Sequence, residues 1–254
     1  MQEVSVIKVG GAVLEDSASL HDFLCAFAKV EGRKILVHGG GRTATSVAAK
    51  LGIETHMVGG RRITDADMLN VVTMVYGGLV NKRVVAQLQA MGINALGLTG
   101  ADGDVIRSHK RPVGDVDYGF VGDVDRADGE LLATLLDSTV PVVAPLTHDG
   151  HGQLLNTNAD TMAQTVATAL ADSCDVTLIY CFEKPGVLMN ADDDSSVIPV
   201  LTPALYAEYK AKGIVSGGML PKLDNAFAAL SAGVKRVVIT SFRDMSGGTV
   251  ITKE

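Results

Sequence analysis

The opening stretch Val4-Ser5-Val6-Ile7-Lys8-Val9-Gly10-Gly11 is a short run rich in β-branched residues that breaks at once into two glycines. This pattern predicts a buried strand followed by a tight turn. A lysine inside such a run is costly to bury without a partner, and the two glycines allow backbone amides to approach a phosphate closely. The stretch therefore predicts a phosphate site beside Lys8, at the carboxyl end of a sheet strand.

The residues after this stretch alternate between helix-like and strand-like patterns. Residues 17–30 place apolar side chains at helical spacing, residues 34–38 form a second apolar strand that ends in three glycines, and a helix is expected from Thr43 to Leu51. Such alternation is typical of a parallel sheet covered by helices. We therefore expect an α/β fold, a three-layer αβα sandwich whose central, mostly parallel sheet runs through two lobes, residues 1–175 and 176–254.

Three later segments carry expectations of their own. Residues 66–91 read as a long helix interrupted by Gly77-Gly78, and their apolar positions exceed one face, which predicts burial on two sides, one of them against a partner subunit. A further helix is expected to begin at Leu223, directly after Lys222. Residues 249–252 are expected to form an edge strand of the sheet.

The composition argues against several classes of protein. The chain has 254 residues, 47% of them hydrophobic, and a formal net charge of -7, which argues against nucleic acid as a partner. No window approaches the roughly 18 consecutive apolar residues that a membrane span needs, and Met1 runs almost directly into a strand without a basic leader. The three cysteines show no metal-binding spacing. We expect a cytoplasmic enzyme with no nucleic-acid or membrane partner.

The glycine-rich turn at residues 39–41 matches neither of two common nucleotide motifs. It is not G-x-G-x-x-G, and no acidic residue ends a second strand at the distance that a Rossmann dinucleotide site needs, which weakens the alternative of an oxidoreductase. The chain contains no P-loop motif either. Two glycine turns after consecutive parallel strands nevertheless converge on one crevice, which favours a binding site there.

A small set of polar residues lies where strands end or helices begin. Transfer of a phosphoryl group needs positive charge around its oxygens and accurate positioning, with little covalent chemistry from the protein. Two lysines from opposite lobes could supply that charge, and an aspartate between them could hold both ammonium groups. Each residue alone fits an ordinary structural role equally well, so the prediction rests on the whole set: Lys8, Arg62, Asn156, Asn158, Asp160 and Lys222.

Five motifs together resemble a known family. In order and spacing they are similar to those of the acetylglutamate kinases, a branch of the amino-acid kinase family, from about residue 4 to the C-terminus. The Lys-x-Gly-Gly start marks the wider family, whereas the glycine block, the Arg-Ile-Thr triplet and the Asn-x-Asn-Ala-Asp segment together are specific to this branch. The motifs are Ile7-Lys8-Val9-Gly10-Gly11, Val37-His38-Gly39-Gly40-Gly41, Arg62-Ile63-Thr64, Leu155-Asn156-Thr157-Asn158-Ala159-Asp160 and Gly218-Met219-Leu220-Pro221-Lys222.

The resemblance implies the amino-acid kinase fold and an activity. The activity is ATP-dependent phosphorylation of the side-chain carboxylate of N-acetyl-L-glutamate, the second step of arginine biosynthesis. By the same resemblance, Lys8 and Lys222 stabilise the transferring phosphoryl group and Asp160 orients them. Mg²⁺ would arrive with ATP, bound through the phosphates rather than by protein side chains. The lobe of residues 1–175 would bind the acylated glutamate, and the lobe of residues 176–254 would bind ATP.

The resemblance also implies binding residues. Backbone amides of Gly10, Gly11 and Gly40 would hold phosphate oxygens. Arg62 would pair bidentately with the α-carboxylate of the substrate. The acylated amino acid would contact Gly40, Gly41, Arg62 and Asn156. The nucleotide would contact Gly186, Val187, Leu188, Ile214, Val215 and Ser216.

Two stretches depart from the family pattern. Residues 180–185 stand where relatives have a shorter Ser/Thr-Asp turn, so no nucleotide contact is carried over to residues 181–183. Arg61 stands beside Arg62 where relatives commonly have an apolar residue. A second guanidinium near the acyl group suggests an alternative substrate, N-succinyl-L-glutamate, whose extra carboxylate Arg61 would pair. An Arg61 that faces solvent would have no such role.

The assembly can also be predicted from the resemblance. Feedback-inhibited relatives carry an N-terminal helix that links dimers into hexamers and builds an arginine site. Because this sequence opens on its first strand, we expect an arginine-insensitive homodimer with residues 66–91 at its interface.

Two further alternatives on the same fold remain. A carbamate kinase has no need of a carboxylate clamp such as Arg62, so the Arg-Ile-Thr triplet argues against it. A non-catalytic nucleotide or amino-acid sensor would be expected to have lost the catalytic set, whereas Lys8, Asp160 and Lys222 are all present.

Overall fold

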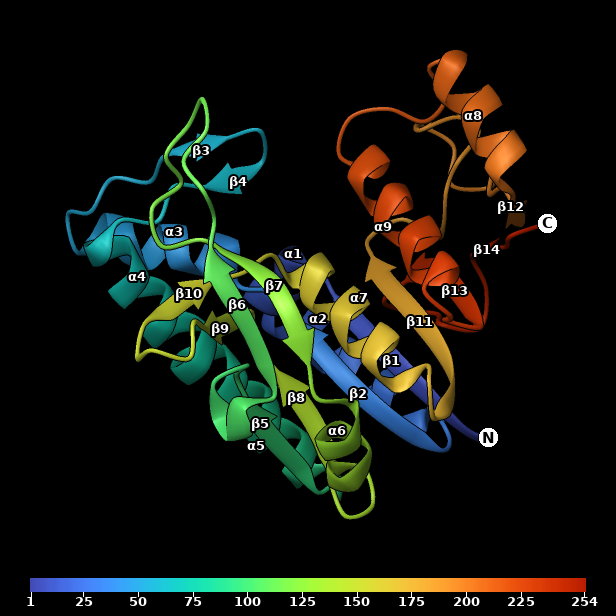
Figure 1. Cartoon of the computed structure of the whole chain (residues 1–254). Coiled ribbons are helices and arrows are strands. Elements are labelled where there is room, and N and C mark those ends of the chain that lie inside the picture. The colour runs from blue at the N-terminus through green and yellow to red at the C-terminus, as the bar shows by residue number, and fades with distance from the viewer.

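An eight-stranded sheet forms the centre of the computed structural model, which describes residues 1–254 (Figure 1). Its strands are β1 (Gln2–Val9), β2 (Arg33–His38), β5 (Ala95–Leu98), β8 (Val140–Val143), β11 (Cys174–Phe182), β12 (Val200–Leu201), β13 (Arg236–Ser241) and β14 (Thr249–Ile251). They lie in the order β12-β14-β13-β11-β1-β2-β8-β5. All neighbours are parallel except β13 and β14.

Helices cover both faces of this sheet. One face carries α6 (Gly129–Leu135), α7 (Ala159–Leu170) and α9 (Met219–Ser231). The other carries α1 (Gly11–Glu15), α2 (Ser17–Lys29), α3 (Gly41–Lys50), α4 (Ala66–Val72), the π-helix η1 (Thr73–Val80) and α5 (Asn81–Ala90). The remaining helices are α8 (Pro203–Ala211) and the short 3₁₀ turn η2 (Asp102–Asp104). The prediction of an α/β fold with a mostly parallel central sheet is confirmed.

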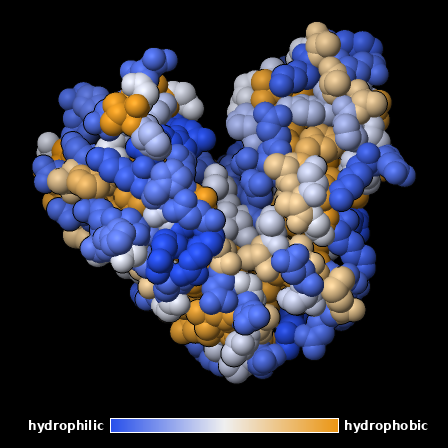
Figure 2. Space-filling model, in the orientation of Figure 1, coloured by the Kyte–Doolittle hydropathy of each residue, from blue (hydrophilic) through white to orange (hydrophobic).

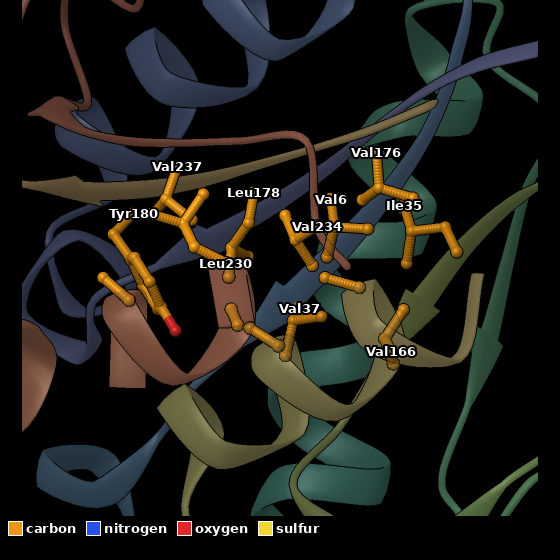
Figure 3. Close-up of a cluster of buried hydrophobic side chains, with 14 of the residues drawn as sticks. Val6, Ile35, Val37, Val166, Val176, Leu178, Tyr180, Leu230, Val234 and Val237 are labelled. Atoms are coloured by element: carbon orange, nitrogen blue, oxygen red, sulfur yellow. The ribbon is translucent and has the colours of Figure 1, made fainter. Parts of the chain in front are cut away.

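The alternation of side chains along β1 divides the core into two layers. Val4 and Val6 belong to the cluster packed under α7 and α9, whereas Ile7 and Val9 belong to the cluster on the opposite face. Figure 3 shows Val6 beside Val234 in the first of these clusters. Successive residues of a strand point to opposite faces, so Lys8 shares the face of Val4 and Val6. The pleat therefore directs this lysine toward α7 and α9.

A smaller sheet and a hairpin extend one side of the molecule. The smaller sheet contains β6 (Ile106–Lys110), β7 (Gly122–Ala127), β9 (Leu146–His148) and β10 (Leu154–Asn156), in the order β10-β9-β6-β7. The hairpin pairs β3 (Met57–Val58) with β4 (Arg61–Arg62). Figure 1 shows the hairpin rising above the sheet opposite α8 and α9, and Figure 2 shows the surface hollowed between these two parts. No helix is long and apolar enough to span a membrane.

The structure corrects three expectations from the sequence. The helical segment of residues 66–91 is not interrupted at Gly77-Gly78, because the chain winds through them as a π-helix. Helix α9 begins at Met219 rather than Leu223, with Gly218 as its N-cap, because Pro221 is tolerated in a first turn, where amides lack intrahelical partners. Strand β14 is not at the edge, because the two-residue strand β12 pairs with its outer side.

Candidate active site

Lys8, Asp160 and Lys222 form one charged cluster at the carboxyl end of β1. The Nζ atom of Lys8 lies 2.7 Å from Oδ1 of Asp160, and that of Lys222 lies 3.1 Å from Oδ2. The side chains of Lys8 and Asp160 are 7% and 14% exposed, whereas that of Lys222 is 25% exposed. One carboxylate therefore holds two ammonium groups from different parts of the chain, and the cluster keeps a net positive charge.

Burial and mutual attraction act against each other in this cluster. Burial alone would raise the pKa of Asp160, but the charges of Lys8 and Lys222 outweigh it and hold the pKa below the usual 3.8. Burial lowers the pKa of Lys8 below its usual value, and Asp160 offsets only part of that effect. Two like charges near one carboxylate are costly unless an anion completes the site, so the cluster is suited to bind a phosphate.

An aromatic ring that the sequence left without a role lies against both lysines. The Nζ atoms of Lys8 and Lys222 are 5.2 and 4.5 Å from the centroid of the Phe182 ring. This ring is stacked on Tyr180, with centroids 6.3 Å apart. The face of an aromatic ring attracts cations, so Phe182 helps to hold the two ammonium groups on one side of the site.

The segment Asn156-Thr157-Asn158-Ala159-Asp160 presents its polar residues through local hydrogen bonds. The Asn158 side chain caps α7 by accepting from the amides of Asp160 and Thr161, at 2.8 and 3.1 Å. This cap places Asp160 in the first turn of the helix, where a carboxylate is favoured. The Asn156 amide donates to Thr64, at 2.9 Å, which fixes it beside the Arg-Ile-Thr triplet.

Arg62 is a buried cation without a carboxylate partner. Only 8% of the residue is exposed. Its guanidinium donates to the Gly41 carbonyl at 2.7 Å, to the Thr45 hydroxyl at 2.9 Å and to the Thr55 hydroxyl at 3.3 Å, all of them neutral acceptors. A buried charge is costly unless an opposite charge is supplied, so this position is suited to an anionic ligand. Bidentate pairing with a carboxylate requires exchange of some of these bonds.

The two glycine turns pack against one another beside this cation. A β-carbon built on Gly11 would lie 3.9 Å from the amide nitrogen of Gly41 and 4.0 Å from that of Gly40. The amide of Gly10 already donates to the Cys181 carbonyl at 3.2 Å, so this predicted phosphate donor is engaged within the protein. Helix α3 has no side-chain cap and no acidic residue in its first turn, which leaves its amides open to a ligand.

One cavity of about 200 Å³ brings most of the predicted catalytic and substrate residues together. It also includes Tyr76 and Asn158, neither of which was assigned a contact with the ligands. Lys222 is joined to the cavity through Asp160. The predicted residues in its lining are Lys8, Gly40, Gly41, Arg61, Arg62, Asn156 and Asp160.

A second cavity of about 160 Å³ lies in the other lobe, between the segment after β11 and the start of α9. All six residues predicted to contact the nucleotide line it. Six of its nine lining residues are hydrophobic, as a flat aromatic base requires. Lys184 and Met219 line it as well; Met219 belongs to the motif that ends in Lys222 but was not assigned a nucleotide contact, and Lys184 was not singled out. The predicted residues are Gly186, Val187, Leu188, Ile214, Val215 and Ser216.

Comparisons with known proteins show the family to which the chain is similar. A model of the amino acid kinase family matches residues 3–241. The acetylglutamate kinase of Phocaeicola vulgatus is 60% identical over 99% of both chains, and that of Bacteroides thetaiotaomicron is 62% identical over 94% of this chain and 93% of its own. The crystal structure of smu.665 from Streptococcus mutans superposes with a TM-score of 0.82 at 27% identity, over 99% of both chains.

The chain therefore belongs to the amino acid kinase family. Within that family, the relatives named acetylglutamate kinase are highly similar to it over nearly their whole length.

Proposed function

We propose that this enzyme transfers the γ-phosphoryl group of ATP to the side-chain carboxylate of N-acetyl-L-glutamate, the second step of arginine biosynthesis. The observation that carries the proposal is the cluster of Lys8, Asp160 and Lys222, which adjoins a cavity that holds the buried cation Arg62. The similarity to acetylglutamate kinases over nearly the full chain supports it. Three free cysteines fit a reducing compartment, and we place the enzyme in the cytoplasm.

Residues 1–175 bind the acylated glutamate and residues 176–254 bind ATP in this proposal. The α-carboxylate pairs with Arg62, exchanging with the threonine hydroxyls that now accept from it. Asn156 and the amides of Gly40 and Gly41 contact the rest of the acylated amino acid. ATP occupies the second cavity, with its γ-phosphate directed toward the lysine cluster. Mg²⁺ would arrive with ATP, held by the phosphates, and would neutralise part of their charge.

The reaction then needs charge stabilisation more than covalent help from the protein. An oxygen of the side-chain carboxylate attacks the γ-phosphorus, and the bond to the β–γ bridging oxygen breaks, so that ADP leaves with that oxygen. Lys8 and Lys222, both held by Asp160, face the oxygens of the phosphoryl group. Asp160 keeps both ammonium groups in place, and the acyl group prevents the amine from attacking the acyl phosphate that forms.

A second candidate substrate, N-succinyl-L-glutamate, has one observation in its favour. Arg61 lines the same cavity as Arg62, is exposed and forms no ion pair within 4 Å. The names of the relatives favour the acetyl compound.

Comparing kcat/KM for the two acyl-glutamates separates these substrates. If N-acetyl-L-glutamate is the substrate, the wild-type enzyme should have a higher kcat/KM for it than for N-succinyl-L-glutamate. Arg61→Ala should then change kcat/KM for N-acetyl-L-glutamate less than twofold. A preference for the succinyl compound that Arg61→Ala abolishes would contradict this assignment and favour the second candidate. Arg126→Ala, which removes an exposed arginine outside the cavity, is the matched control.

We also propose that the enzyme is a homodimer joined through η1 and the sheet edge at β5. Three apolar side chains are exposed on this surface: Met74 and Leu79 of η1, at 54% and 51%, and Leu96 of β5, at 37%. Lys82 of α5 donates a hydrogen bond to the Gly97 carbonyl of β5, which ties this helix to the sheet edge. Apolar side chains beside an unpaired edge strand fit a second copy of the same surface.

Light scattering tests this interface. The wild-type protein is expected at twice the chain mass of 26.5 kDa, and Leu79→Glu is expected to give a monomer because it places a charge in the apolar contact. Leu51→Glu, at an exposed leucine after α3, is expected to remain dimeric. A Leu79→Glu protein with the wild-type mass would exclude this surface.

A further inference from the structure

Tyr76 forms a wall of the cavity that holds Arg62, although nothing in the motif pattern pointed to it. Only 5% of the residue is exposed, and it lines the cavity together with Gly40 and Gly41. Its ring lies directly against Gly40, since a β-carbon on that glycine would come within 2.8 and 3.0 Å of two ring atoms. The glycine is therefore required by the tyrosine ring as well as by any ligand that approaches the turn.

The hydroxyl of Tyr76 lies near the guanidinium of Arg62, at the start of α3. A β-carbon built on Gly41 would be 3.7 Å from Nη2 of Arg62 and 3.9 Å from the Tyr76 hydroxyl oxygen. The hydroxyl and the cation thus flank the same residue, whose helix begins with amides that no side chain caps. A carboxylate can accept hydrogen bonds from all three of these groups: the hydroxyl, the guanidinium and the free amides.

The Tyr76 hydroxyl is in the protonated state that a hydrogen-bond donor needs. Burial raises the pKa of this phenol above its usual value of 10.0, and the nearby charge of Arg62 offsets part of the effect. The hydroxyl therefore remains protonated throughout the physiological range. A neutral hydroxyl adds a hydrogen bond to an anion without adding a charge that must itself be balanced.

The helix that carries Tyr76 has an unusual winding at this point. Residues Thr73–Val80 form a π-helix between α4 and α5, and such segments are rare and frequently occur at functional sites. The same eight residues place Tyr76 in the cavity wall and leave Met74 and Leu79 exposed.

We propose that the Tyr76 hydroxyl is a substrate-binding group that donates a hydrogen bond to the α-carboxylate of the acylated glutamate, beside Arg62 and the first amides of α3. This inference rests on the proposed function, since it assumes that substrate. It assigns Tyr76 to recognition of the substrate and not to the phosphoryl transfer itself.

Tyr76→Phe tests this assignment because it removes only the hydroxyl. We expect KM for N-acetyl-L-glutamate to rise about 10-fold, as for loss of a hydrogen bond to a charged group, while kcat and KM for ATP change less than twofold. The inhibition constant of 4-acetamidobutyrate, which lacks the α-carboxylate, should be the same for wild type and variant. Tyr206→Phe removes a buried hydroxyl in the other lobe, bonded to Asp224, and should leave all four constants unchanged.

The outcomes separate a binding role from a structural one. An unchanged KM, with or without a lower melting temperature, would overturn the proposal, as would an equal loss for 4-acetamidobutyrate. An equal change in KM for ATP would also contradict it. If wild type does not phosphorylate N-acetyl-L-glutamate at all, the proposed function fails, and that result is distinguishable because it does not depend on the variant.

Discussion

Replacing Lys222 with methionine is expected to lower kcat by about 100- to 1000-fold and to change either KM much less. Its ammonium group is held by Asp160 at 3.1 Å and lies over the Phe182 ring, so it is fixed before substrate arrives. A cation fixed in this way stabilises charge that develops on the phosphoryl oxygens more than charge already present in bound ATP. Steady-state kinetics with both substrates varied measures the effect.

A matched lysine shows whether the effect belongs to the site. Lys210 lies in the same lobe and also sits over an aromatic ring, that of Tyr206, but outside both cavities. Lys210→Met should retain the wild-type kcat. A Lys222→Met enzyme whose kcat is unchanged and whose KM for ATP is raised would show that Lys222 only binds the nucleotide.

Replacing Asp160 with asparagine is expected to lower the free energy of unfolding at pH 7 by about 3–5 kcal/mol, because it leaves Lys8 buried without its counter-charge. The folded-state pKa of Asp160 lies below the usual 3.8. Its contribution to stability is therefore complete above about pH 4 and is lost as the pH falls through the folded-state pKa. Urea unfolding of wild type and variant at pH 7 measures the difference.

A second substitution distinguishes loss of a charge partner from general damage. Lys8→Met in the Asp160→Asn background removes the unpaired charge, so the double variant should be more stable than Asp160→Asn alone. If the double variant is less stable than the single one, the buried pair is not the source of the loss.

Much of the fold was predictable because its signals are local. The β-branched run of β1 and the glycine turns act within a few residues of where they occur in the sequence. A lysine in an apolar run indicated a site because it is costly to bury without a partner, and the pleat of β1 directs it toward α7 and α9. The six residues predicted to contact the nucleotide came from motif resemblance and fall in one cavity.

The remaining features depend on contacts between distant segments. Tyr76 lies in a helix whose π winding no periodicity reveals, and its role is visible only beside Gly40 and Arg62. Phe182 looked like a departure from a motif, and only the folded chain places it against both lysines. Strand β12 has two residues, too few for any pattern.

Incubating the wild-type enzyme with ATP, Mg²⁺ and N-acetyl-L-glutamate, and trapping the product with hydroxylamine, tests whether the side-chain carboxylate is phosphorylated. We expect ADP and the hydroxamate to form in equal amounts, and unacylated glutamate to give little of either. ADP release that does not depend on N-acetyl-L-glutamate, or release without hydroxamate, would contradict phosphorylation of its side-chain carboxylate.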